Sequence, residues 1–236
     1  MRLIGAIVGL ALLAGCVVPS EGVSPPVQTA AQATVQTEPS ALAKRNFVVA
    51  LNAMEPVVER YCHALTQRQN CDFQIAIDDR PNQSPNAFQT LDRQGRPVLA
   101  FNLALIANAE NVDELAFVMG HEAAHHIMGH IPQQQQSASQ GAMLAGLLIA
   151  VGGGDEAAIL RAQEFGASVG ARRFSKGFEL EADALGAEMT EKAGFDALRG
   201  AAYFDRLPDP GDQFLGSHPP NAARRATVQK VVNSLR

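Results

Sequence analysis

The clearest chemistry in this chain lies in the five residues His121-Glu122-Ala123-Ala124-His125. Histidines four positions apart on a helix project from the same face, so both imidazoles can reach one metal ion. Glu122 is rotated by about 100° from His121, which puts it beside the metal, where it can accept a proton from water. Two neutral imidazoles, a further ligand and an open position are typical of catalytic zinc. The spacing therefore predicts a site for one Zn²⁺ per chain.

The same helix does not offer a suitable third ligand. His126 and His130 are rotated by about 100° and 140° from His125, so neither is expected to face the same ion. A metzincin would have glycine at position 128 and histidine at position 131, but this chain has Met128 and Ile131. The metzincin class is therefore excluded.

A later acidic cluster, Glu179-Leu180-Glu181-Ala182-Asp183, is the better source of a ligand. Glu179 and Asp183 are four apart and share a helix face. One of these carboxylates can bind zinc while the other holds a ligating imidazole by its second nitrogen. Alone, the cluster would suit a solvated helix face equally well, but its place after the His-Glu-x-x-His segment favours the metal site.

Three motifs in this order resemble metallopeptidase family 48, which includes HtpX and the CAAX prenyl proteases. They are His-Glu-Ala-Ala-His, then Glu-Leu-Glu-Ala-Asp-Ala-Leu-Gly, then Ser217-His218-Pro219-Pro220 with Arg224, and the match spans about residues 84–230. HtpX and the prenyl proteases are multi-pass proteins, whereas the ten-residue apolar run 142–151 cannot span a bilayer. The chain is more similar to the small periplasmic members, the BepA-like and LoiP-like proteases, without a tetratricopeptide extension.

The resemblance implies a role for each matching residue. The zinc ligands would be His121, His125 and Glu179, with Glu122 as general base, Asp183 orienting an imidazole, and His218 and Arg224 near the active site. The family histidine at the position of His218 is thought to assist the substrate carbonyl or its developing oxyanion. From chemistry alone, His218 is a histidine in a proline-rich turn that suits a surface or a cleft equally.

Asn86-Ala87-Phe88 resembles the family's Asn-Ala-Phe at the strand that binds an extended substrate. Such a strand would give a peptide main-chain hydrogen bonds. Any edge strand could look like this, so the functional and the purely structural interpretations stay open.

The surrounding pattern predicts an α+β fold, a mostly helical zincin-type (gluzincin) domain over residues 41–236 with a small antiparallel sheet or hairpin. Strands are expected at 73–77, 86–90 and 97–102, the last two flanking a turn at 92–96. Helices are expected at 41–65 (bent at Pro56), 111–131, 137–169, 177–193, 196–206 and 221–235.

The first residues read as a targeting segment. Residues 1–15 combine a positive start with a short apolar run, as in a signal peptide, and Leu13-Ala14-Gly15-Cys16 resembles a bacterial lipobox. Cys16 would then be acylated and anchor the protein in a membrane; Val17 after it suggests the outer membrane, facing the periplasm. Residues 16–40 are rich in proline and small polar residues, which predicts a flexible tether. An ordinary signal peptide with an incidental cysteine is the alternative.

Cys62 and Cys71 are the remaining cysteines. In an oxidising periplasm they are expected to form a disulfide, and two free thiols are the alternative.

The apolar run 142–151 is expected to be a buried helix. A surface helix that contacts a membrane or partner, or a mobile cover over the cleft, is the alternative, and Gly152-Gly153-Gly154 would permit such motion.

Composition limits the remaining possibilities. The 236 residues are 47% hydrophobic, which suits a globular domain, and a formal charge of −5 argues against nucleic-acid binding. The sequence thus predicts a zinc endopeptidase acting on extended, unfolded or misassembled envelope proteins. A periplasmic lipoprotein chaperone or assembly adaptor with a latent or structural zinc site is the rival interpretation. A helical interaction protein with a chance motif would bind no metal. The sequence indicates neither the oligomeric state nor the cleavage specificity.

Overall fold

The computed structural model describes residues 38–173, 175–207 and 219–236. They belong to one compact unit, Val35–Arg236. The predicted leader, Cys16 and the tether up to residue 37 lie outside the described residues, and so does His218. None of the helices in the described ranges is long and apolar enough to span a bilayer.

Helices dominate the fold, which confirms the predicted class. Their bounds are α1 (Ala41–Leu65), α2 (Leu103–Asn108), α3 (Val112–Ile127), α4 (His130–Val151), α5 (Glu156–Arg173), α6 (Ser175–Lys192), α7 (Ala197–Ala201), the 3₁₀ helix η1 (Ala202–Arg206) and α8 (Asn221–Leu235). Pro56 lies inside α1, as expected.

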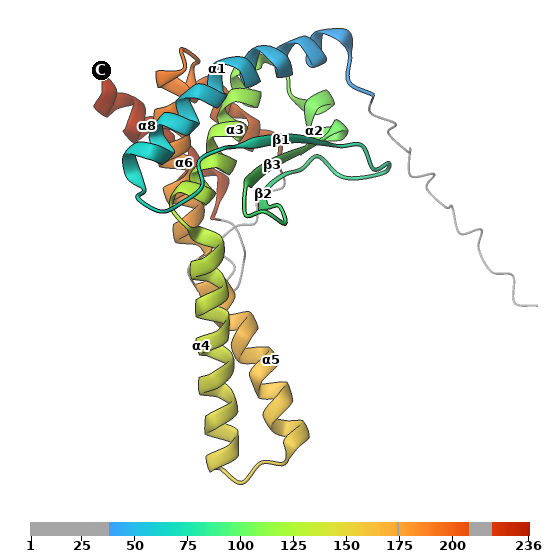
Figure 1. Cartoon of the computed structure of the whole chain (residues 1–236), viewed down its shortest axis with the longest axis vertical. Coiled ribbons are helices and arrows are strands. Elements are labelled where there is room, and N and C mark those ends of the chain that lie inside the picture. The colour runs from blue at the N-terminus through green and yellow to red at the C-terminus, as the bar shows by residue number, and fades with distance from the viewer. Residues whose placement is uncertain (1–37, 174, 208–218) are drawn as a thin grey trace, which may run out of the picture. The chain divides into compact units, whose positions relative to one another are not determined.

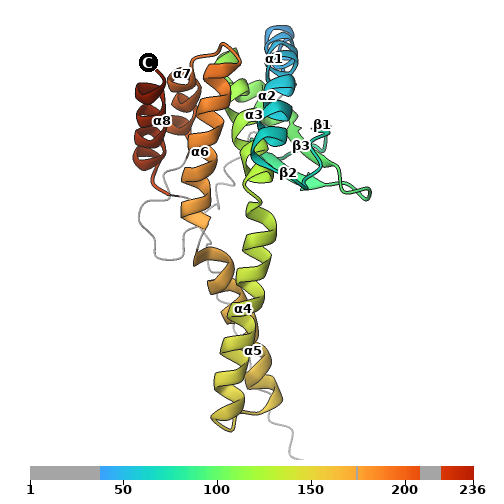
Figure 2. The same cartoon turned by 60° about the vertical axis from the view of Figure 1, so that its left-hand side comes forward.

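Helix α3 lies at the centre of the domain (Figure 1) and packs against α1, α6 and α7. In the turned view, α1 lies on one side of α3 and α6, α7 and α8 lie on the other (Figure 2). Asn111 caps it by accepting a hydrogen bond from the backbone N–H of Glu114 at 3.0 Å. Leu115, Met119 and Ala123 are almost fully buried along α3. The helix that carries the predicted zinc motif is therefore held on several sides.

The sheet is mixed and has the strand order β1-β3-β2 in the described part of the chain. Strand β2 (Ala87–Leu91) pairs antiparallel with β3 (Pro97–Asn102), which confirms the predicted hairpin. In its turn, Asp92 Oδ1 accepts hydrogen bonds from the backbone N–H groups of Gln94 and Arg96, and Gly95 has φ 78°. Strand β1 (Gln74–Asp78) pairs with β3 in parallel, so the sheet is not purely antiparallel. Strand β2 lies at an edge.

Two helix predictions were wrong in their bounds. The helix expected over 111–131 ends at Ile127, because Gly129 adopts φ 66° and α4 starts anew at His130. The helix expected over 137–169 is a hairpin of α4 and α5, whose connection contains Gly153 at φ 79°. Helix α2 was not predicted; Asn102 caps it by accepting from the N–H of Leu105.

The expectation that the apolar run 142–151 is buried was also wrong. Leu147, Leu148 and Val151 are 57%, 74% and 81% exposed. Figure 2 shows why: α4 and α5 lie side by side and extend away from α3 and α6, so the outer face of α4 meets no other described element. The run is therefore part of a surface helix, and the contact with a membrane or partner that this alternative includes stays a prediction.

Candidate metal and catalytic site

The site forms where α3 and α6 come into close contact through glycines. A Cβ added at Gly120 would lie 2.8 Å from the carbonyl oxygen of Gly186, and one at Gly186 would lie 2.8 Å from the backbone nitrogen of His121. No side chain larger than hydrogen fits between these backbones. The contact sets the distance between the histidines of α3 and the carboxylates of α6.

Three side chains point one donor atom each at a common centre. His121 Nε2 and His125 Nε2 are 3.1 Å apart, and the Glu179 carboxylate lies 3.6 Å from the first and 3.4 Å from the second. All three donor atoms fall within 4.8 Å of one another. His126 turns away, with Nε2 2.8 Å from the carbonyl oxygen of Asn70, so it is not one of the converging groups.

Asp183 and Arg224 hold the back of His121. Asp183 Oδ1 lies 2.9 Å from His121 Nδ1, and the Arg224 guanidinium donates to both oxygens of Asp183 at 2.7 and 2.8 Å. The guanidinium also lies 3.7 Å from the centre of the Phe204 ring. Burial opposes the charged carboxylate, but the hydrogen bonds from His121 and Arg224 outweigh it and lower the pKa of Asp183. Asp183 is therefore an acceptor that keeps a proton on His121 Nδ1 and leaves Nε2 free to bind.

A second chain of hydrogen bonds, which was not predicted from the sequence, holds His125. His130 Nδ1 lies 2.9 Å from His125 Nδ1, and His130 Nε2 lies 3.2 Å from Glu181 Oε2. The Phe178 ring stacks on His130 at 4.5 Å. An ionised carboxylate only accepts hydrogen bonds, so His130 Nε2–H donates to Glu181. In a neutral imidazole this leaves His130 Nδ1 to accept a hydrogen bond from His125 Nδ1–H. The Nε2 of His125 is then unprotonated too.

The donor set fits a divalent cation. With both Nδ1 atoms protonated, two imidazole lone pairs and an acceptor-only carboxylate face one another. These groups repel one another unless a proton or a metal cation lies between them. Two neutral imidazoles and one carboxylate are a common catalytic zinc set. His121, His125 and Glu179 are the residues that would hold the ion.

Glu122 lies beside this group, in a cavity of about 200 Å³ that also exposes His121, Glu179 and Arg224. Burial raises the pKa of the Glu122 carboxyl. A general base is most effective when its pKa is closer to the working pH. Asn86 and Ala87, at the start of β2, line the same cavity. The base, two of the three converging ligands and the start of the edge strand thus line one cavity.

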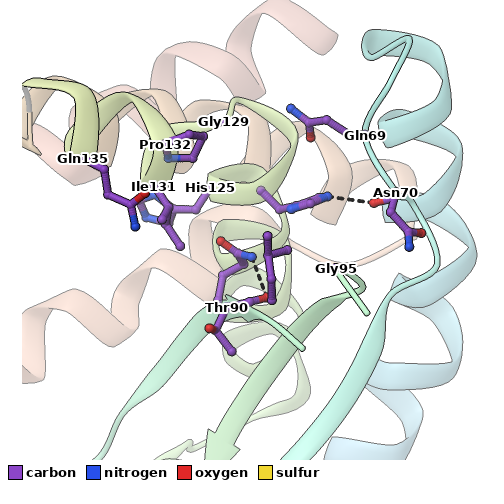
Figure 3. A pocket seen from close by; sticks show the side chains of 12 residues that line it. Gln69, Asn70, Thr90, Gly95, His125, Gly129, Ile131, Pro132 and Gln135 are labelled. Carbon is purple, nitrogen blue, oxygen red and sulfur yellow. Dashed lines mark hydrogen bonds between the residues drawn. The ribbon is translucent and has the colours of Figure 1, made fainter. Parts of the chain in front are cut away.

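A second cavity of about 370 Å³ is lined by His125 (Figure 3). Gln89, Thr90 and Leu91 from β2 form one wall, so β2 runs past the metal-ligand group from one cavity to the other. Gln69 and Asn70 form another wall. They belong to the loop closed by the disulfide between Cys62 and Cys71. Gln69 is tied to α3 by its amide, which donates to the carbonyl oxygen of Ile127 at 3.3 Å.

The structure brings together most of the sequence-predicted residues. His121, Glu122, His125, Glu179, Asp183 and Arg224 converge, and Asn86 and Ala87 line the cavity. Phe88 is 37% exposed and lines neither of these cavities. The residues missed are His130 and Glu181. Gly129, a glycine directly before a histidine, was the signal that the helix could end and turn His130 back toward His125.

Comparison with known proteins agrees with this geometry. The model of peptidase family M48 matches residues 52–232. A Beta-barrel assembly-enhancing protease of Yersinia pestis is 23% identical over 92% of this chain and 49% of its own length. The protein of that name from Escherichia coli is 28% identical over 56% of this chain and 30% of its own. A Vibrio cholerae protein, given the same name provisionally, is 35% identical over 47% and 24%. The chain therefore spans half or less of the length of these relatives. With most of its length matched by the family model, it belongs to peptidase family M48, a family of metallopeptidases.

Proposed function

We propose that this protein is a zinc-dependent endopeptidase that cleaves extended segments of unfolded or misassembled cell-envelope proteins. The observation that carries the proposal is the shared cavity: Glu122, two of the converging ligands (His121 and Glu179) and the start of β2 all border it. The ligand atom of His125 lies within 4.8 Å of those of the other two. The names of the relatives, which are proteases that enhance β-barrel assembly, favour an envelope substrate.

Zinc, when bound, polarises a carbonyl oxygen and makes water more acidic. The protein's own residues supply the proton transfers. Glu122 takes the proton of the attacking water on its carboxylate and returns it to the leaving amine. Its partly desolvated position, which raises its pKa, suits both halves of this transfer. Asp183 and Arg224 keep His121 oriented throughout.

The substrate would lie along β2. An edge strand presents unpaired N–H and C=O groups, which hold a peptide by its main chain and need it to be extended. The second cavity has amide, hydroxyl and aliphatic groups in its wall, from residues such as Gln89, Thr90 and Leu91, and would accept an uncharged side chain. His218 would stabilise the developing oxyanion, by family resemblance. The proposed setting is the periplasm, with the protein held at the outer membrane by an acyl group on Cys16.

The decisive experiment compares Glu122→Gln with the wild-type protein. We expect the variant to keep about one zinc per chain, measured by atomic emission, while cleavage of an unfolded casein reporter falls by at least about 100-fold. Glu110→Gln, a change of the same kind at an exposed carboxylate, serves as control and should cleave normally. Substantial turnover by Glu122→Gln would contradict the assigned base.

The rival function is a chaperone or assembly adaptor that uses the same groove and a structural zinc site. It predicts that Glu122→Gln corrects an envelope-assembly defect as well as the wild type. The protease predicts that only the wild type does so. The two functions therefore separate in the same strain background.

A further inference from the structure

The α4–α5 hairpin is built with its small residues inside and its large apolar residues outside. A Cβ added at Gly141 would lie 2.1 Å from the carbonyl oxygen of Gly166, and one at Gly170 would lie 2.1 Å from that of Ser137. The two helix backbones thus touch along the hairpin.

Five large apolar residues of α4 form one exposed face, here called the apolar stripe: Met143, Leu144, Leu147, Leu148 and Val151, which are 57–81% exposed. Their spacing of one, four, five and eight residues keeps them on one side of the helix. Gly141, Ala145 and Gly146 occupy the other side, toward α5. On α5, Leu160 and Phe165 are exposed as well.

The positions of the small and the large apolar side chains are the reverse of those in a helical hairpin of a water-soluble protein. In water, two amphipathic helices place their large apolar side chains between them, because that burial is the driving force. In lipid that force is absent, so small residues let the backbones approach while large apolar residues face the acyl chains. The hairpin follows the second pattern.

The hairpin has no net charge from its acidic residues and arginines, which suits a binding partner whose surface is uncharged overall. Helix α4 contains no acidic residue, lysine or arginine. Across residues 130–173, three arginines and three acidic residues cancel. An anionic membrane or an acidic protein would therefore gain little from this surface, and attraction to it must come from apolar contact.

The length of the stripe decides how it would meet a bilayer. It extends about 12 Å along α4 at ~1.5 Å per residue, far less than a spanning helix requires. Asp155 and Glu156 at the turn of the hairpin would make entry turn-first costly. A helix that lies in the plane of the membrane, with one face at the boundary of headgroups and acyl chains, suits a short stripe and keeps the charged turn in water.

We propose that the apolar stripe of α4 binds the surface of a lipid bilayer with zwitterionic headgroups, with the helix lying in the plane of the membrane. This contact is additional to the acyl chain expected on Cys16 and does not depend on it. A second attachment point would also limit how the cleft turns relative to the membrane.

The test uses residues 17–236, which lack the expected leader and acylated cysteine but contain the whole compact unit. Binding to phosphatidylcholine vesicles is measured by co-sedimentation for the parent and for Leu147→Gln/Leu148→Gln. We expect the double variant to lose at least about tenfold in the partition coefficient, and parent binding to be unchanged in 0.5 M salt, about the level at which exposed charges are screened. Leu42→Gln/Leu65→Gln removes two leucines that are each 58% exposed outside the stripe and should bind like the parent. Equal loss in both double variants, or no parent binding, would overturn the proposal.

A tryptophan reports the depth directly, because the chain contains none. We expect Leu148→Trp to shift its emission to the blue when vesicles are added and to be quenched by brominated acyl chains, while Leu65→Trp stays unchanged. The main alternative occupant is the same stripe of a second copy. A blue shift that follows protein concentration instead of lipid, with a dimer in sedimentation velocity, would overturn the membrane proposal in favour of that interface.

Discussion

The contacts between α3 and α6 and between α4 and α5 are both made through glycine, but their surroundings differ. Between α3 and α6, Gly120 and Gly186 bring the backbones together beneath His121, and the flanking side chains are buried. Between α4 and α5, Gly141 and Gly166 do the same, yet the flanking large side chains point outward. Close backbone approach therefore says nothing about function by itself. Between α3 and α6 the contact sets the position of the candidate metal ligands. Between α4 and α5 it leaves the large apolar side chains of α4 on the exposed face.

The largest expected effect tests the polar network behind the first pair. Arg224→Ala should lower the free energy of unfolding by about 3–5 kcal/mol, because it leaves the fully buried Asp183 without its cation. Arg225→Ala is a matched control on the same helix: its exposed ion pair with Asp205 should contribute at most ~1 kcal/mol. Urea denaturation of both variants measures the difference. Equal losses would mean that the network is not part of the stabilising core.

The next effect tests the glycine contact. Gly186→Ala should cost about 1–3 kcal/mol by overpacking and should weaken zinc binding, because its Cβ would press on the backbone of His121. Gly177→Ala, also on α6 but with open space at the Cβ position, should be neutral or slightly stabilising. Competition with a zinc-sensitive dye and thermal melts supply the readouts.

Gly166→Ala tests the glycine contact of the α4–α5 hairpin in the same way. It should loosen the contact between α4 and α5 and leave zinc affinity unchanged. A loss of zinc comparable to that of Gly186→Ala would break the distinction between the two pairs.

A smaller effect concerns the chain from Glu181 through His130 to His125. We expect His130→Ala to weaken zinc binding by about 10–100-fold, the usual range for partners that orient a ligating imidazole. His63→Ala, which removes an exposed histidine, is the control and should bind zinc like the wild type. Unchanged affinity in His130→Ala would show that His125 is oriented without this hydrogen bond.

The smallest effect is expected on the outer face of the hairpin. In lipid-free buffer, Leu147→Gln and Leu148→Gln should each change the free energy of unfolding by no more than about 0.5 kcal/mol, because both side chains are already largely solvated. Chemical denaturation checks this. A loss of 2 kcal/mol or more would mean that these leucines are buried in solution, against another copy or another part of the chain.

Sequence alone predicted what depends on local spacing. The His-Glu-x-x-His helix, the cluster from Glu179 to Asp183 and the hairpin around Gly95 each follow from periodicity or turn chemistry within a few residues. The role of His130 did not follow, because it depends on a helix that breaks at Gly129. The exposure of the stripe did not follow either. An apolar run has the same pattern whether it faces a core or lies on the surface, and the placement of Gly141 against Gly166, which turns the large side chains outward, depends on the packing of two helices.

The hairpin also affects how the ligands meet during folding. His125 and Glu179 are 54 residues apart, and most of the chain between them is α4 and α5. Once these two helices pair, the ends of the intervening segment are already near each other, and the loop left to close is roughly ten residues long. Loop closure costs about 0.6 kcal/mol per doubling of length, so pairing saves between about 1 and 2 kcal/mol when Glu179 joins the histidines. Ligands that are far apart in the sequence are thus separated by only a short loop once α4 and α5 have paired.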